Sequence, residues 1–283
     1  MKTSTRVCLY ALVYACLLQS NSLFAAAPNK AELVGSQKLG IVDKLAAIKD
    51  KAKVTIGITM IEPFAVQNKD NTVSGYDVDF AIAIAQKLGV KAVVVPLIAE
   101  ERVQAIQSGR VDMVFGFTKS TMWEKDLLLS TGYMVTEQKV IAPIHKVKKI
   151  NDIAMLTTAV VKGTASEPII KKEIPSIRLL TFDTLQQAFD ALDKGQVQAV
   201  TADDPALLGQ QNKLHNKKLF EIPPVSISIK IYSIGVAKNE TSFMNMLNQI
   251  LADAEKDGSA QNIFDRWFGP QTAIPMTRTF KIK

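Results

Sequence analysis

Residues 103–114 (VQAIQSGRVDMV) and residues 189–200 (FDALDKGQVQAV) repeat one pattern in two distant parts of the chain. In each copy, apolar residues at helical spacing are followed by a glycine, Gly109 or Gly195, and then by an apolar strand pattern. A glycine after the last helical turn is typical of a helix end, because it adopts the left-handed conformation without strain. Each copy therefore predicts a helix that leads into a strand. Two such units predict two similar α/β lobes, each with its own mostly parallel sheet and with a ligand site between them.

Strand and helix patterns alternate on both sides of the two repeats. Strands are expected at 54–59, 91–97, 113–117, 157–162, 177–182, 197–202 and 228–237. Helices are expected at 40–49, after Asp77 as the N-cap, at 241–254 and from Ser259 onward. The segments near 138–142 and 229–233 are long and extended, and we expect them to be the two crossings between the lobes.

The first 27 residues have the three parts of a secretory signal peptide. Lys2 and Arg6 give a positive start, residues 7–18 form an apolar stretch, and Ala25, Ala26 and Ala27 provide small residues for cleavage. The apolar stretch is too short to cross a bilayer about 30 Å thick. Export to the periplasm is therefore predicted. A lipoprotein anchor fits poorly, because Tyr14 disrupts the motif before Cys16.

Composition excludes several classes of protein. Both cysteines, Cys8 and Cys16, would be removed with the signal peptide, which leaves no thiol for a disulfide, a nucleophile or a metal site. The two histidines, His145 and His215, have no metal-ligand neighbour at helical spacing. The formal net charge of +7 comes from scattered lysines without interleaved aromatics, so nucleic-acid binding is not expected. No nucleotide-binding or nucleophile motif occurs, and we expect no cofactor and no metal.

Five short motifs follow one another in a familiar order. They are 75–80 (GYDVDF), 107–112 (QSGRVD), 162–164 (KGT), 201–205 (TADDP) and 267–269 (WFG). Together they resemble the family 3 periplasmic solute-binding proteins, the polar amino-acid receptors of ABC transporters. The resemblance runs through almost the whole chain after the signal peptide. It implies a two-lobed periplasmic-binding-protein fold with a hinge, a monomer, a small-molecule solute and a permease partner in the inner membrane.

The repeats and the resemblance together give a division of the chain into parts. We expect a signal peptide at 1–27, an N-terminal arm and helix at 28–53, a first lobe at 54–140, a second lobe at 141–231, a return to the first lobe at 232–270 and a tail at 271–283.

The resemblance also implies a set of ligand-binding residues. An aromatic ring covers the ligand, a first-lobe hydroxyl and a second-lobe turn hold its carboxylate, and a second-lobe aspartate holds its ammonium group. The matching residues are Phe64, Thr118 or Ser120, Lys162 with Gly163 and Thr164, and Asp203. Backbone N–H groups at the turn favour an anion, and a desolvated aspartate favours a cation. Other roles are open, because Phe64 could be a core residue and both Thr164 and Asp203 could cap helices.

One position departs from the family pattern. Where the family carries an arginine that grips the ligand carboxylate, this chain has Trp123. A tryptophan offers a π surface for an apolar or cationic group, and it has no fork of donors for a carboxylate. Lys119, Lys125 or Lys162 could supply a point charge instead. We therefore expect no tight binding of glutamate or aspartate, and a ligand with a neutral or positive head group against Trp123 and Phe64.

Three functions are compatible with these motifs. The first is a transport receptor that closes around its solute and delivers it to an ABC permease. The second is an enzyme on the same fold that resembles cyclohexadienyl dehydratases, with Glu62 or Glu167 as the acid or base. The third is a periplasmic accessory or sensor protein that no longer binds amino acids.

Overall fold

The computed structural model describes residues 43–283, so the predicted signal peptide and the first part of the N-terminal arm lie outside the described residues. The helices are α1 (Lys44–Asp50), α2 (Tyr76–Leu88), α3 (Arg102–Gln107), α4 (Thr121–Glu124), α5 (Ser166–Glu173), α6 (Leu185–Asp193), α7 (Asp204–Gln211), α8 (Thr241–Lys256) and α9 (Ser259–Phe268). The strands are β1 (Lys53–Thr59), β2 (Val66–Gln67), β3 (Val73–Ser74), β4 (Lys91–Leu97), β5 (Met113–Thr118), β6 (Leu127–Leu129), β7 (Met134–Pro143), β8 (Thr157–Val161), β9 (Arg178–Phe182), β10 (Ala199–Asp203), β11 (Phe220–Glu221) and β12 (Ser228–Ala237).

The two repeated segments have the structures that their sequences predict. α3 leads into β5, and α6 leads into β10. Gly109 and Gly195 lie between each helix and its strand with φ values of 72° and 69°, in the left-handed region that favours glycine. Both units are therefore helix-to-strand connections. The last residue of each strand, Thr118 in β5 and Asp203 in β10, lines the same cavity.

The main sheet is a single mixed sheet, which corrects the expectation of two separate, mostly parallel sheets. Its order is β4-β1-β5-β12-β7-β10-β8-β9, with β6 beside β12 and β11 beside β7. The pairs β1 with β4 and β5, and β8 with β9 and β10, are parallel, whereas every pair that includes β7 or β12 is antiparallel. The two long strands join the parallel groups because they also pair with each other, from Ser228 opposite Gln138 to Tyr232 opposite Met134.

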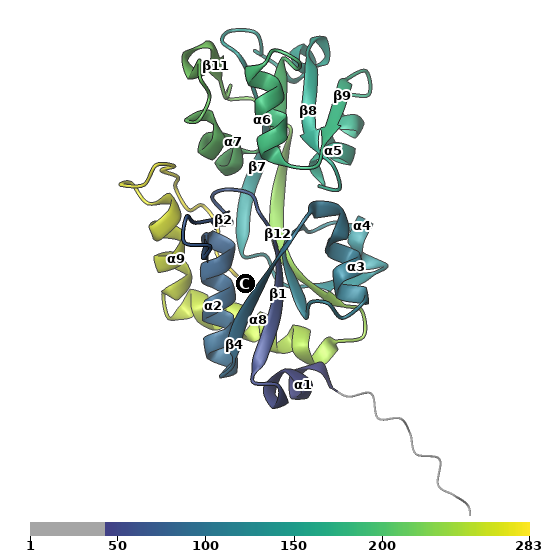
Figure 1. Ribbon diagram of the computed structural model, residues 1–283, viewed down its shortest axis with the longest axis vertical. Coiled ribbons are helices and arrows are strands. Elements are labelled where there is room, and N and C mark those ends of the chain that lie inside the picture. The colour runs from purple at the N-terminus through teal and green to yellow at the C-terminus, as the bar shows by residue number, and fades with distance from the viewer. Residues whose placement is uncertain (1–42) are drawn as a thin grey trace, which may run out of the picture. The chain divides into compact units, whose positions relative to one another are not determined.

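Helices cover both parallel groups of strands (Figure 1). α2 packs on β1 and β4, while α5 and α6 pack on β8 and β10. After β12, the chain packs again on elements that come earlier in the sequence. α8 contacts α1, α2 and β6, and it also contacts the following helix α9. None of the helices within residues 43–283 is both long enough and apolar enough to cross a membrane.

The start of α2 differs from the expectation and bears on the site. Asp77 was expected to be the N-cap, but the helix begins at Tyr76 and its N-cap is Gly75, which has no side chain to cap it. The chain must pass close to Phe64 here, because the backbone N–H of Asp77 donates to the carbonyl of Phe64 at 3.0 Å. A side chain at Gly75 would collide with that carbonyl. The Asp77 carboxyl is therefore free to turn into the protein interior, where it is 4% exposed.

Candidate functional site

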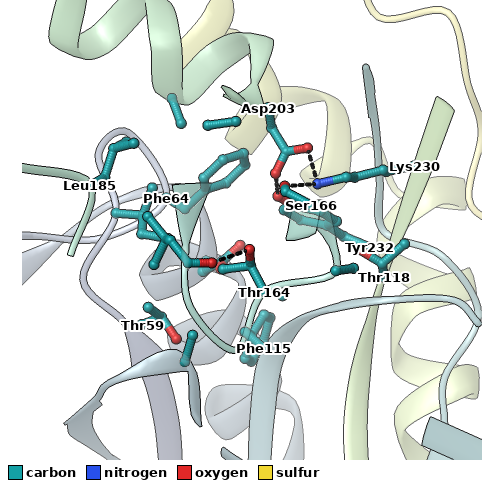
Figure 2. A pocket seen from close by; sticks show the side chains of 18 of the residues that line it. Thr59, Phe64, Phe115, Thr118, Thr164, Ser166, Leu185, Asp203, Lys230 and Tyr232 are labelled. Carbon is teal, nitrogen blue, oxygen red and sulfur yellow. Dashed lines mark hydrogen bonds and ion pairs between the residues drawn. The ribbon is translucent and has the colours of Figure 1, made fainter. Parts of the chain in front are cut away.

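One cavity collects polar side chains from elements that are far apart in the sequence (Figure 2). Its walls come from the ends of β1, β5 and β10, the starts of α2, α3 and α5, and the middle of β12. The polar residues that line it are Thr59, Asp77, Arg102, Thr118, Thr164, Ser166, Thr201, Asp203, Lys230 and Tyr232. Four of them carry ionisable groups of opposite sign, Asp77 and Asp203 against Arg102 and Lys230. A cavity of this kind suits a small polar or charged solute.

Four of the predicted site residues line this cavity, namely Phe64, Thr118, Thr164 and Asp203. Phe64 is 3% exposed, and its ring centroid lies 5.3 Å from that of Tyr232 and 6.4 Å from that of Phe268. It therefore forms part of the cavity wall and part of the core together. Thr164 does not cap α5, whose N-cap residue is Ala165 and which has no side-chain cap; the Thr164 hydroxyl donates to the carbonyl of Val161 at 2.7 Å.

The other four predicted residues do not line the cavity. The Ser120 hydroxyl caps α4 by accepting from the backbone N–H of Met122 at 3.3 Å. Lys162 is half exposed and pairs with Glu100 at 2.9 Å. Gly163 has φ of 71° and lies against the backbone of Glu100, which leaves no room for a side chain. Trp123 packs edge-on against Phe117, with ring centroids 5.1 Å apart.

Asp203 occupies the N-cap position of α7, yet its carboxylate makes no capping hydrogen bond. It is directed into the cavity instead. Its Oδ1 lies 2.7 Å from the Nζ of Lys230, and its Oδ2 accepts a short hydrogen bond from the hydroxyl of Tyr232. The Lys230 ammonium also donates to the hydroxyl of Ser166 at 2.7 Å. Burial, followed by the charge of Asp203, raises the pKa of Tyr232 well above its ordinary value, so the phenol stays protonated and donates.

Sequence reasoning did not identify Lys230. A lysine in an apolar strand pattern is usually interpreted as facing solvent. Lys230 is instead 2% exposed, and the Asp203 carboxylate compensates its charge inside the protein. Only the pairing of β12 with its neighbours decides which face of the strand points inward. No local signal in the sequence carries that information.

Sequence reasoning also did not identify Arg102, which places a guanidinium in the cavity wall from the start of α3. Its N–H groups donate to three backbone carbonyls, those of Ala99 at 3.0 Å, Gly116 at 2.9 Å and Gly163 at 3.1 Å. Its central carbon lies 4.6 Å from the ring centroid of Phe117. Burial lowers the pKa of Arg102 to about 10, which leaves it cationic at neutral pH. The cavity therefore contains an arginine after all, supplied by a different element from the one where Trp123 stands.

Asp77 is the second carboxyl group in the cavity wall. Its Oδ1 accepts from the hydroxyl of Tyr133 at 2.8 Å, and that hydroxyl in turn accepts from the backbone N–H of Gly116 at 3.1 Å. Burial raises the pKa of Asp77 to about 7, and the Tyr133 hydrogen bond and the charge of Arg102 only partly oppose this. Asp77 therefore keeps its proton to a higher pH than an exposed aspartate does.

The two glutamates considered as catalytic groups lie outside the cavity. Glu62 forms an ion pair with Lys213, and Glu167 pairs with Lys171 at 2.7 Å; neither glutamate lines the cavity. Within residues 43–283, no group of three or more histidine, cysteine, aspartate or glutamate side chains is placed to hold a metal ion.

Most of the chain matches a known protein family in sequence. Residues 54–270 match the family described as bacterial extracellular solute-binding proteins, family 3. The chain is 28% identical over 255 residues to the ABC transporter glutamine-binding protein GlnH of Bacillus subtilis (strain 168). The matched region covers 87% of this chain and 92% of that protein.

Two solved structures extend the likeness to the fold. One is an ancestral amino acid-binding protein, AncCDT-1, described as a precursor of cyclohexadienyl dehydratase; it is 26% identical, with a TM-score of 0.71 over 79% of this chain and 98% of that chain. The other is a solute receptor for L-cysteine of Neisseria gonorrhoeae, which is 27% identical, with a TM-score of 0.71 over 78% of this chain and 92% of that chain. With most of its length matched in sequence and a mixed α/β fold in common with these receptors, this chain belongs to the bacterial extracellular solute-binding proteins of family 3.

Proposed function

We propose that this protein is a periplasmic receptor that captures a small, polar, amino-acid-like solute and delivers it to an ABC permease. The observation that carries the proposal is the buried cavity with two ionisable groups of each sign in its wall. The relatives named above are amino-acid-binding proteins, one of them a component of an ABC transporter. The signal-peptide pattern at 1–27 and the extracellular character of the family support export.

The proposed mechanism is closure of two lobes around the solute. The first lobe comprises residues 54–140 and 232–270, and the second comprises residues 141–231. Support comes from the helices after β12, which pack on α1 and α2, and from the two groups of parallel strands that only β7 and β12 connect. Bending of β7 and β12 would open the cavity, because Thr118 and Asp203 then belong to different lobes.

Calorimetry combined with small-angle scattering tests this function. The protein is first unfolded and refolded to remove any carried solute, and it is then screened against amino acids and related carboxylic acids. A true ligand at a concentration of 100 times its Kd should stabilise the fold by about 2.7 kcal/mol, and it should lower the radius of gyration through closure. If no compound in the screen stabilises the protein and the scattering does not change, the accessory or sensor role is favoured instead.

A pair of hydroxyl variants tests the position of the site. Thr118→Val should weaken solute binding by about tenfold to a hundredfold, because one hydrogen bond to a charged ligand group is lost. Ser120→Ala is the matched control, since that hydroxyl lies two residues further on, caps α4 and does not line the cavity. Calorimetry should therefore give the wild-type affinity for Ser120→Ala. Equal losses in the two variants would contradict the assignment of the cavity as the solute site.

A further inference from the structure

Lys230 places a buried ammonium group in the cavity beside a carboxylate and a hydroxyl. Its Nζ is 2.7 Å from Asp203 Oδ1 and 2.7 Å from Ser166 Oγ, and the side chain is 2% exposed (Figure 2). A carboxylate and a hydroxyl are acceptors that suit a primary ammonium group, which has three N–H donors and no acceptor. The chain supplies that ammonium itself, from the middle of β12.

Both oxygens of the Asp203 carboxylate already face donors from the protein itself. Asp203 Oδ1 faces Lys230, and Asp203 Oδ2 is occupied by the hydroxyl of Tyr232. A solute ammonium placed beside Asp203 would lie within a few ångströms of the Lys230 ammonium, where two like charges in a desolvated site repel strongly. The alternative, displacement of Lys230, would leave a buried cation without its partner, which is also unfavourable.

Other groups in the cavity wall are suited to an anion. Arg102 is cationic and uses three of its N–H donors on backbone carbonyls, and a guanidinium has five such donors. The hydroxyl of Thr59 is buried without a hydrogen-bond partner among the described residues, and Thr59 lines the cavity. Figure 2 shows Thr59 away from the cluster of Asp203, Lys230 and Ser166. Cationic and hydroxyl donors of this kind match the oxygens of a carboxylate.

We infer that Lys230 is a built-in replacement for the solute ammonium, so that the cavity prefers carboxylic acids without a free α-ammonium group to the corresponding amino acids. This inference rests on the proposed function and narrows its solute class. Arg102 and Thr59 bind the carboxylate, and the Asp203–Lys230 pair stays intact when the solute enters. The preference arises from the ion pair and does not depend on the rest of the solute.

Matched pairs of solutes that differ only in the α-ammonium group test the inference by calorimetry. The pairs are L-glutamate with glutarate, L-glutamine with 4-carbamoylbutanoate, and L-alanine with propionate. The wild-type protein should bind the acid without the ammonium at least about tenfold more tightly in the pair that it binds best, which corresponds to about 1.4 kcal/mol. In Lys230→Met, Asp203 is freed and the order within that pair should reverse.

Two further variants are controls for the Lys230→Met result. They test whether it arises from a loss of folding or from a general change in charge. Lys230→Gln keeps a donor to Ser166 without the charge, and it should also shift the preference towards the amino acid. Lys139→Met removes a partly buried lysine from the neighbouring strand, where it pairs with Glu137 at 3.1 Å outside the cavity, and it should keep the wild-type order. A wild-type protein that prefers the amino acid in the pair that it binds best overturns the inference and leaves the receptor function standing. Absence of binding of all six compounds by the wild-type protein also overturns the inference, and the wider screen of amino acids described above then decides the receptor function.

Discussion

Replacing Arg102 with methionine is expected to lower the free energy of unfolding by about 3–5 kcal/mol. Arg102 is 5% exposed and its guanidinium donates to three backbone carbonyls, and each buried polar group left without a partner costs about 1–3 kcal/mol. Methionine fills much of the volume but donates no hydrogen bond. Urea denaturation monitored by circular dichroism measures the change, and the same variant should lose most of its affinity for a carboxylate solute.

Two other variants separate this effect from a change in surface charge. Arg102→Lys keeps the cation but cannot reach three carbonyls with a fixed planar fork, so its stability should lie between those of the wild type and Arg102→Met. Arg110→Met removes a nearby arginine that is about half exposed and pairs with Glu101 at 2.8 Å. Because exposed ion pairs contribute little, that change should stay within about 0.5 kcal/mol. Similar decreases in the free energy of unfolding for Arg102→Met and Arg110→Met would show that the buried hydrogen bonds contribute little to stability.

The second large effect is a pH-dependent gain in stability for Asp77→Asn. The pKa of Asp77 is raised to about 7 in the folded protein from an ordinary value of 3.8. The folded state therefore holds a proton that the unfolded chain releases between these two values, and stability falls as the pH rises through this window. Asparagine cannot ionise, and its carbonyl still accepts from Tyr133. The unfolding free energy of Asp77→Asn relative to wild type should rise by about 3 kcal/mol between about pH 4.5 and pH 8.

An exposed aspartate provides the control for this pH series. Hydrogen bonds from the side chain and backbone of Thr72 lower the pKa of Asp70, so this group is ionised in both the folded and the unfolded protein above about pH 5. The difference in stability between wild type and Asp70→Asn should therefore stay constant from about pH 5 to pH 8. A constant difference for Asp77→Asn over the same interval would mean that Asp77 is ionised in the folded protein at acid pH.

The sequence predicts those features of the fold that depend on neighbouring residues. The helix ends at Gly109 and Gly195 follow from the conformational freedom of glycine, and α8 follows from its apolar spacing. The single mixed sheet was not predictable in this way. It depends on pairing between β7 and β12, whose residues are far apart in the sequence, and hydrophobic periodicity carries no information about partners.

The cavity shows the same limit at the level of side chains. Thr118 and Asp203 could be identified because each stands at the end of a strand where the family resemblance implies a ligand contact, and both line the cavity. Lys230 could not, because apolarity would place the isoleucines of β12 inside, whereas Ile229 is 68% exposed, Ile231 is 41% exposed and Lys230 is buried. Arg102 was missed for a similar reason, since an arginine at the start of a short helix usually faces water.

The alternation of side chains along β12 has a consequence for how this protein can change during evolution. Lys230 and Tyr232 face the cavity, and Ile229 and Ile231 face away from it. A shift of β12 by one residue in its pairing with β5 and β7 would exchange the two sets, because successive side chains of a strand point to opposite faces. The cavity would then be lined by isoleucines, and the lysine would be in solvent. Point substitutions can adjust the solute preference gradually, but a one-residue shift in the register of this strand would abolish it in one step.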